Sequence, residues 1–171
     1  MKRELLILRH AKSDWETGAP SDFDRPLAKR GKRDAPKVGR FLKRQGLVPD
    51  YVVSSPARRA KQTVIAACEE MGVDAGAIHW DPRIYHARAG TLLDVLNECP
   101  ENAQRVLIAG HNPGLEILLQ NLCNHVIPEQ EDYKLLPTAA VAHLEILSSW
   151  KDLEGRLARL VSLTRSRSLS D

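Results

Sequence analysis

Leu5-Leu6-Ile7-Leu8-Arg9-His10, near the start of the 171-residue chain, joins an uninterrupted apolar run to two basic side chains. A strand that is apolar on both faces is typical of a parallel sheet with helices on each side. The run therefore predicts a buried first strand at residues 5–8 that delivers Arg9 and His10 to one edge of the sheet.

Apolar runs and helical periodicities alternate along the rest of the chain. We expect further strands at 51–53, 77–80, 106–109, 139–147 and 156–163, the last with a helix as the alternative, and helices within 29–45, 56–71, 91–97 and 113–122. Pro36 must then lie near the first turn of its helix or bend it. Residues 12–25 carry turn-forming residues and are expected to form a surface loop.

This order of elements implies an α/β fold, a three-layer α/β/α sandwich with a mostly parallel central sheet. The length fits a single domain spanning residues 1–171, with a mobile tail from about residue 164.

Apolar residues make up 43% and charged residues 27% of the chain, as in globular proteins that dissolve in water. The N-terminal apolar run is too short for a signal peptide or a membrane span, and three scattered cysteines fit a reducing compartment, so we expect a cytoplasmic protein.

The strand ends bring together residues that suit a phosphoryl group. Ligands in open α/β sheets bind at the carboxyl ends of the strands. The residues that follow three of the predicted strands are Arg9 and His10, then Ser54, Ser55, Arg58 and Arg59, then Gly110, His111 and Asn112. Arginine presents paired donors that match phosphate oxygens, and a neutral imidazole can attack phosphorus. Positioning and charge stabilisation supply most of the catalysis in phosphoryl transfer, so this arrangement requires no metal.

Three motifs in order carry a family resemblance. Leu8-Arg9-His10-Ala11-Lys12-Ser13, Ser55-Pro56-Ala57-Arg58-Arg59-Ala60-Lys61-Gln62-Thr63 and Gly110-His111-Asn112-Pro113 resemble the signatures of the histidine phosphatase (phosphoglycerate mutase-like) superfamily. The short chain and Asp24-Arg25-Pro26-Leu27 resemble the SixA-type phosphohistidine phosphatase branch. The resemblance covers about residues 4–147 and implies a phosphoglycerate mutase-like fold.

The resemblance also implies roles for individual residues. His10 matches the nucleophile, and Arg9, Arg59 and His111 match the phosphate pocket. Ser13, Arg25 and Asn112 are candidates for further contacts with the substrate. Neither a metal nor a cofactor is implied.

One departure from the superfamily narrows the expected substrate. Many members carry a glutamate that protonates an alkoxide leaving group, and some carry an aspartate directly after the second histidine. Here that position is Asn112, and residues 81–97 contain no glutamate. General acid catalysis contributes roughly 10²–10⁴ in rate, and imidazole leaves more readily than an alkoxide. We therefore expect hydrolysis of phosphohistidine in a protein; the alternatives are a small-molecule phosphate monoesterase and a phospho-binding protein without turnover.

Other features of the sequence are expected to have structural roles. Cys99 and Arg105 have the spacing of cysteine-dependent phosphatases, but the segment follows a helix and precedes a strand, so the match is interpreted as chance. His79, His86, His125 and His143 lack ligand spacing, although Tyr85 and His86 lie near the place where an acid would be sought.

The expected partners follow from the charge distribution. A net charge of +3 is too small to indicate nucleic acid. The basic C-terminal tail, with Arg156, Arg159, Arg165 and Arg167, lacks interleaved aromatic residues and is interpreted as a solvated end. We expect a monomer that acts on a phosphorylated protein or a small phosphate, and that binds neither nucleic acid nor membranes.

Overall fold

The computed structural model describes residues 2–123, 127, 134–155 and 158–170. Within these residues one mixed, mostly parallel sheet has the strand order β3-β2-β4-β1-β5-β6. Its strands are β1 (Arg3–Arg9), β2 (Tyr51–Ser54), β3 (Ile78–Trp80), β4 (Arg105–Gly110), β5 (Val141–Ile146) and β6 (Ala158–Thr164). The first four strands run parallel, whereas β5 pairs antiparallel with both β1 and β6.

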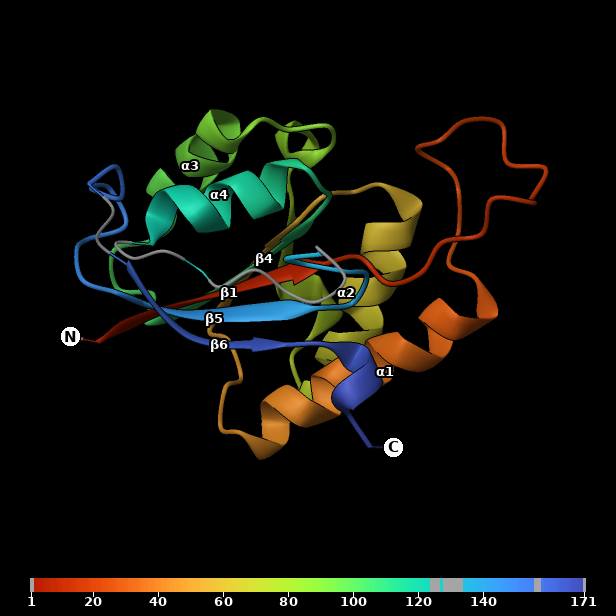
Figure 1. Ribbon diagram of the computed structural model, residues 1–171, viewed down its shortest axis with the longest axis horizontal. Coiled ribbons are helices and arrows are strands. Elements are labelled where there is room, and N and C mark those ends of the chain that lie inside the picture. The colour runs from red at the N-terminus through yellow and green to blue at the C-terminus, as the bar shows by residue number, and fades with distance from the viewer. Residues whose placement is uncertain (1, 124–126, 128–133, 156–157, 171) are drawn as a thin grey trace.

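Helices cover both faces of this sheet (Figure 1). They are α1 (Lys29–Arg44), α2 (Arg58–Met71), α3 (Ala89–Asn97) and α4 (Gly114–Leu122), with short 3-10 turns η1 (Ala75–Ala77), η2 (Pro82–Ile84) and η3 (Ser166–Ser168). Side chains of α1 and α2 share one buried cluster, and those of α3 and α4 share another. The predicted α/β/α sandwich is therefore confirmed.

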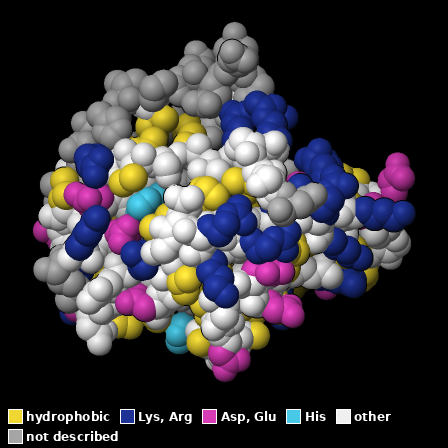
Figure 2. All heavy atoms as spheres, turned by 90° about the horizontal axis from the view of Figure 1, so that it is seen from below, with side chains coloured by type: hydrophobic (Ala, Val, Ile, Leu, Met, Phe, Trp, Pro, Cys, Tyr) yellow, Lys and Arg dark blue, Asp and Glu magenta, His cyan; other side chains and the backbone are white. Residues whose placement is uncertain are grey.

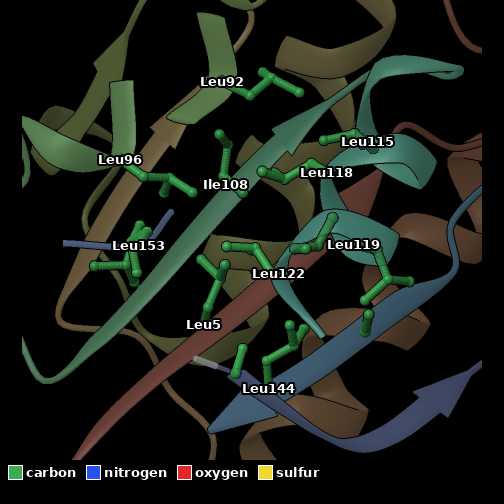
Figure 3. Close-up of a cluster of buried hydrophobic side chains, with 14 of the residues drawn as sticks. Leu5, Leu92, Leu96, Ile108, Leu115, Leu118, Leu119, Leu122, Leu144 and Leu153 are labelled. Atoms are coloured by element: carbon green, nitrogen blue, oxygen red, sulfur yellow. The ribbon is translucent and has the colours of Figure 1, made fainter. Parts of the chain in front are cut away.

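The burial of β1 on both faces explains why its apolar run has no polar interruption. Leu5 and Ile7 belong to the cluster beneath α3 and α4, whereas Leu6 and Leu8 belong to the cluster beneath α1 and α2. Successive side chains of a strand point to opposite faces, so both faces of β1 are buried. Figure 3 shows the first cluster, in which Leu5 and Leu144 from the sheet face leucines of α4.

The predicted elements are present with small shifts at their ends. The C-terminal segment forms an edge strand, β6, rather than the alternative helix. Pro36 lies well inside α1 rather than in its first turn. Residues 166–168 form η3 against α1, so the tail has a defined place even though its mobility stays a prediction. In the described part of the chain, no helix is both long and apolar enough to cross a membrane.

Candidate active site

Three adjacent strands end at the same edge of the sheet. Arg9 at the end of β1 pairs with Gly110 at the end of β4, and Ser54 at the end of β2 pairs with Ala109. Backbone hydrogen bonds extend this alignment one residue further, because His10 N donates to Gly110 O at 3.1 Å. The segments that follow these three strands therefore start side by side at the same edge of the sheet.

His10 is buried and is held in a defined orientation. Its Nδ1 lies 2.7 Å from the carbonyl oxygen of Ala11. A carbonyl oxygen only accepts, so Nδ1 carries the proton and Nε2 of the neutral ring keeps its lone pair. Burial lowers the pKa of His10 from its ordinary 6.5 to about 4, and the positive charges of Arg9, Arg59 and Arg25 act in the same direction. The imidazole is therefore neutral, and Nε2 is the nitrogen available for attack.

His111 lies beside His10, with ring centroids 5.2 Å apart. Its Nε2 is 2.8 Å from Ser55 Oγ, while its buried Nδ1 has no hydrogen-bond partner among the described residues. Burial is also the largest cause that lowers the pKa of His111, to about 3. A second neutral imidazole thus stands at the site, with one ring nitrogen unpaired.

Arg59 lies in the first turn of α2 and is only 5% exposed, whereas its neighbour Arg58 is exposed. Its guanidinium donates to both the backbone oxygen of Asp22, at 2.8 Å, and the Asp22 carboxylate, at 3.1 Å. Tyr85 also donates its hydroxyl to this carboxylate, at 2.7 Å. A hydrogen bond from Tyr85 is the largest cause that holds the pKa of Asp22 well below its usual range, followed by hydrogen bonds and charges from the arginines. The Asp22 carboxylate is therefore ionised and bound to Arg59.

Arg9 and Asn112 meet at one backbone oxygen. Arg9 Nη1 and Asn112 Nδ2 donate to Leu136 O at 3.3 and 2.8 Å. Asn112 Nδ2 also donates to Glu116 Oε1 at 2.6 Å. Arg9 Nε and Asn112 Oδ1 are buried without a hydrogen-bond partner among the described residues, so polar groups at this end of the site are left unpaired.

Ser13 and Arg25 form a second hydrogen-bonded pair near His10. Arg25 Nη1 donates to Ser13 Oγ, and the guanidinium lies 3.6 Å from the ring centroid of Trp15. Arg25 also donates to Asp22 Oδ1 at 3.1 Å. Its positive charge contributes to the low pKa of His10, so Arg25 acts on the site electrostatically.

Residues 12–25 lie in a loop, as predicted, and Asp22 within it is exposed. Asp22 was not among the predicted site residues, yet it bridges Arg59, Arg25 and Tyr85. An aspartate among other polar residues in a loop carries no sequence signal of such a contact. Tyr85, which the sequence placed near the position sought for an acid, lies with its ring centroid 5.4 Å from that of His111.

Gln62 and Thr63 are a second omission, although they stand in the motif that identified Arg59. Thr63 Oγ1 donates to Arg59 O at 2.7 Å and accepts from Ala11 N at 3.0 Å. Gln62 Oε1 accepts from Leu27 N at 2.8 Å. These side chains tie α2 to the segment that carries His10, and their motif spacing was the signal that could have found them.

Most residues expected to be structural lie away from the site, whereas His86 lies against Tyr85 with its Nε2 4.0 Å from Asp22 Oδ2. Burial raises the pKa of the Cys99 thiol to about 12, and Arg105 is paired with Glu4, so neither is arranged for nucleophilic catalysis. His79 stacks on Tyr51 and His143 contacts Glu4, whereas His125 lies outside the described residues. Among the residues that the structure describes, no group of three or more His, Cys, Asp or Glu side chains is placed to hold a metal ion.

The comparisons with known proteins agree with this fold. The sequence profile of the histidine phosphatase superfamily (branch 1) matches residues 5–84. An uncharacterized Mycobacterium tuberculosis protein, Rv1276c, is 35% identical over 159 residues, which cover 90% of this chain and 96% of that protein. The chain belongs to the histidine phosphatase superfamily, branch 1.

Three solved structures of other proteins are similar to this fold. A protein of Nakamurella multipartitia provisionally assigned as phosphohistidine phosphatase SixA is 26% identical and superposes with a TM-score of 0.81 over 96% of both chains. A protein of Agrobacterium tumefaciens with the same provisional assignment is 27% identical, with a TM-score of 0.76 over 96% of this chain and 99% of that one. The protein histidine phosphatase SixA in complex with tungstate, 20% identical with a TM-score of 0.79 over 96% and 97% of the two chains, shares the fold.

Proposed function

We propose that this protein is a metal-independent phosphatase that hydrolyses phosphohistidine in proteins through a covalent intermediate on His10. The observation that carries the proposal is the neutral, oriented His10, with Nδ1 bound to Ala11 O and positive charges of three arginines acting on it. A nucleophile surrounded by fixed cations provides the positioning and charge stabilisation that phosphoryl transfer needs.

The proposed reaction has two steps. His10 Nε2 attacks phosphorus as the substrate N–P bond breaks, and the electron pair of that bond leaves with the substrate imidazole. A phosphohistidine whose second ring nitrogen is protonated releases neutral imidazole. Water then attacks the phosphoryl group on His10, which yields inorganic phosphate and restores the neutral ring. Arg9 and Arg59 would stabilise the negative charge of the phosphoryl oxygens in both steps.

The carboxyl groups near the site support a substrate with a good leaving group. A general acid must hold a proton at the working pH. The pKa of Asp22 is lowered through its hydrogen bonds to Tyr85 and the arginines, so its carboxyl group carries no proton at neutral pH. Glu116 accepts a hydrogen bond from Asn112 Nδ2 on the α4 side. Phosphoramidates tolerate this arrangement better than alkyl phosphates, because imidazole is a weaker base than an alkoxide.

A comparison of three substrates tests the proposal: phosphoramidate, a phosphohistidine peptide and glycerol phosphate. We expect kcat/KM for both N–P substrates to exceed that for the alkyl ester by at least about 10², the lower end of the contribution of a general acid. Comparable turnover of glycerol phosphate would instead support the small-molecule monoesterase, and absence of turnover on all three would support a phospho-binding protein.

His10→Ala supplies the matched variant. It should abolish turnover while tungstate still binds, because the arginines remain. A denatured wild-type sample taken during turnover should carry phosphate in the acid-labile, base-stable linkage of phosphohistidine. Retained activity in His10→Ala would overturn the mechanism.

A further inference from the structure

Six basic side chains line one hollow beside the candidate active site, between α1, the segment before β5 and the C-terminal turn η3. We call this hollow the basic groove. It has a volume of about 310 Å³ and one acidic lining residue, Asp34; the basic ones are Arg30, Arg33, Lys37, Lys134, Arg165 and Arg167. Figure 2, which views the molecule from below, shows Lys and Arg side chains gathered on this underside.

The groove accounts for the basic character of the whole chain. Its seven charged side chains carry a formal charge of +5, whereas the complete chain carries +3. The remainder of the chain is therefore net negative. A local excess of positive charge of this kind attracts anionic partners.

The C-terminal turn contacts α1 at this place. Ser166 Oγ lies 3.4 Å from Asp34 Oδ2, and Arg30 Nε lies 3.8 Å from the same oxygen. The carboxylate of Asp34 is buried and thus occupied within the fold. Arg165 and Arg167 of the predicted solvated end line the same hollow as α1, and Arg167 is exposed.

The basic groove shares a wall with the candidate active site. Pro137 and Thr138 line it, and Arg30 donates to Thr138 Oγ1 at 3.4 Å. The residues on either side of this pair contact the site: Leu136 O accepts from Arg9, and Ala139 N donates to His10 O. A molecule that presents a phosphoryl group to His10 can therefore contact the groove at the same time.

We propose that the basic groove docks an acidic surface of the phosphohistidine protein that the active site dephosphorylates. This rests on the proposed function and specifies its substrate class. Cations around a site speed association with an anionic partner, and their effect falls as salt screens them. A nucleic-acid ligand is the less favoured occupant, because no aromatic side chain lines the groove among the described residues.

Two synthetic peptides of about 20 residues test the inference. An extended chain of that length spans roughly 66 Å, so one peptide can place its phosphohistidine at His10 and its other residues in the groove. Both carry one phosphohistidine; one has a run of glutamates and the other has glutamines at the same positions. Phosphoramidate, which has the N–P bond but no docking segment, reports on the chemistry alone. We expect the wild type to favour the glutamate peptide about tenfold in kcat/KM at low salt, and this preference to shrink as salt is added.

Arg33→Gln/Arg167→Gln removes two charges of the groove, and Lys43→Gln/Arg44→Gln removes two exposed charges at the far end of α1 as the matched control. The first double variant should lose most of the preference through KM and keep wild-type turnover of phosphoramidate; the second should keep both. The inference would be overturned if the wild type showed no preference or if both variants lost it equally. It would also be overturned if single-stranded RNA bound at this groove more tightly than the glutamate peptide. Failure of the proposed function is distinct, because phosphoramidate would then not be hydrolysed by any of these proteins.

Discussion

Asp22 places a negative charge in the proposed phosphate pocket, where a phosphoryl group requires positive charge. Its carboxylate and backbone oxygen occupy the two terminal nitrogens of Arg59, and Arg25 donates to the same carboxylate. A phosphoryl group that approaches Arg59 must therefore share or displace these contacts, and it also meets the charge of Asp22. In the proposed pocket, Asp22 would both orient the arginines and compete with their phosphoryl ligand.

The competition predicts that Asp22→Asn binds oxyanions more tightly. Removing the negative charge while keeping a similar shape should lower the Kd for tungstate by about tenfold, or ~1.4 kcal/mol. Isothermal titration calorimetry measures this directly. Asp24→Asn is the control, because that side chain lies in the same loop but accepts only from Ser21 among the described residues. Weaker tungstate binding by Asp22→Asn would show that orientation of Arg59 outweighs competition.

His10 allows a test of its protonation without any substrate. Burial lowers its pKa to about 4, so its ring should stay neutral across the range in which an exposed histidine titrates. We expect the ¹³Cε1 resonance of His10 to move with a midpoint near pH 4 in an NMR titration. His10→Gln assigns the signal by its loss. A midpoint near 6.5 would contradict the buried, arginine-flanked environment.

At the scale of elements, two glycines of α1 hold the helix against different neighbours. A Cβ at Gly31 would lie 2.1 Å from the backbone oxygen of Lys12, and a Cβ at Gly39 would lie 2.4 Å from that of Ala67 in α2. Real Cβ atoms do not approach that closely, so either substitution must move α1. Only the first contact involves the segment that carries His10.

The two contacts predict different outcomes for Gly31→Ala and Gly39→Ala. Both should lower the free energy of unfolding by about 1–3 kcal/mol, the usual cost of overpacking. Gly31→Ala should also lower kcat on phosphoramidate, because it displaces the backbone after His10, whereas Gly39→Ala should leave kcat near wild type once folded. Denaturant unfolding and steady-state kinetics on the same samples measure both effects. Equal kcat in the two variants would refute the link between α1 and His10.

The elements of the sheet were predictable because their signal is local. The apolar run of β1 is read from neighbouring residues, and the strand ends carry Arg9, His10 and His111 by position alone. The contact between Asp22 and Arg59 spans 37 residues and joins a loop to a helix, so no periodicity records it. The placement of η3 against α1 likewise depends on tertiary packing of a polar segment, for which hydrophobic pattern gives no guide.

At the scale of the whole molecule, the site lies at the edge of the apolar sandwich, and the packing of the sandwich buries its histidines. His10 and His111 stand at the ends of strands whose side chains fill both core clusters. The same burial that makes the imidazoles neutral also couples their protonation to folding. The chemistry at the edge of the sheet and the stability of the fold therefore respond to pH together.

This coupling predicts acid sensitivity. Both histidines have folded pKa values below the ordinary 6.5, so the unfolded chain binds protons that the folded chain does not. Stability from this source is complete above about pH 6.5 and is lost as the pH falls from there toward 4, with a slope that approaches about 1.4 kcal/mol per pH unit for each histidine.

Urea unfolding between about pH 7 and 5 should show the decline before the carboxylates, including Asp22, begin to titrate. His111→Gln should remove about half of the slope, because one of the two buried imidazoles is then absent. Stability that stays flat over this range in the wild type would mean that the two imidazoles are as accessible to protons in the folded protein as in the unfolded chain.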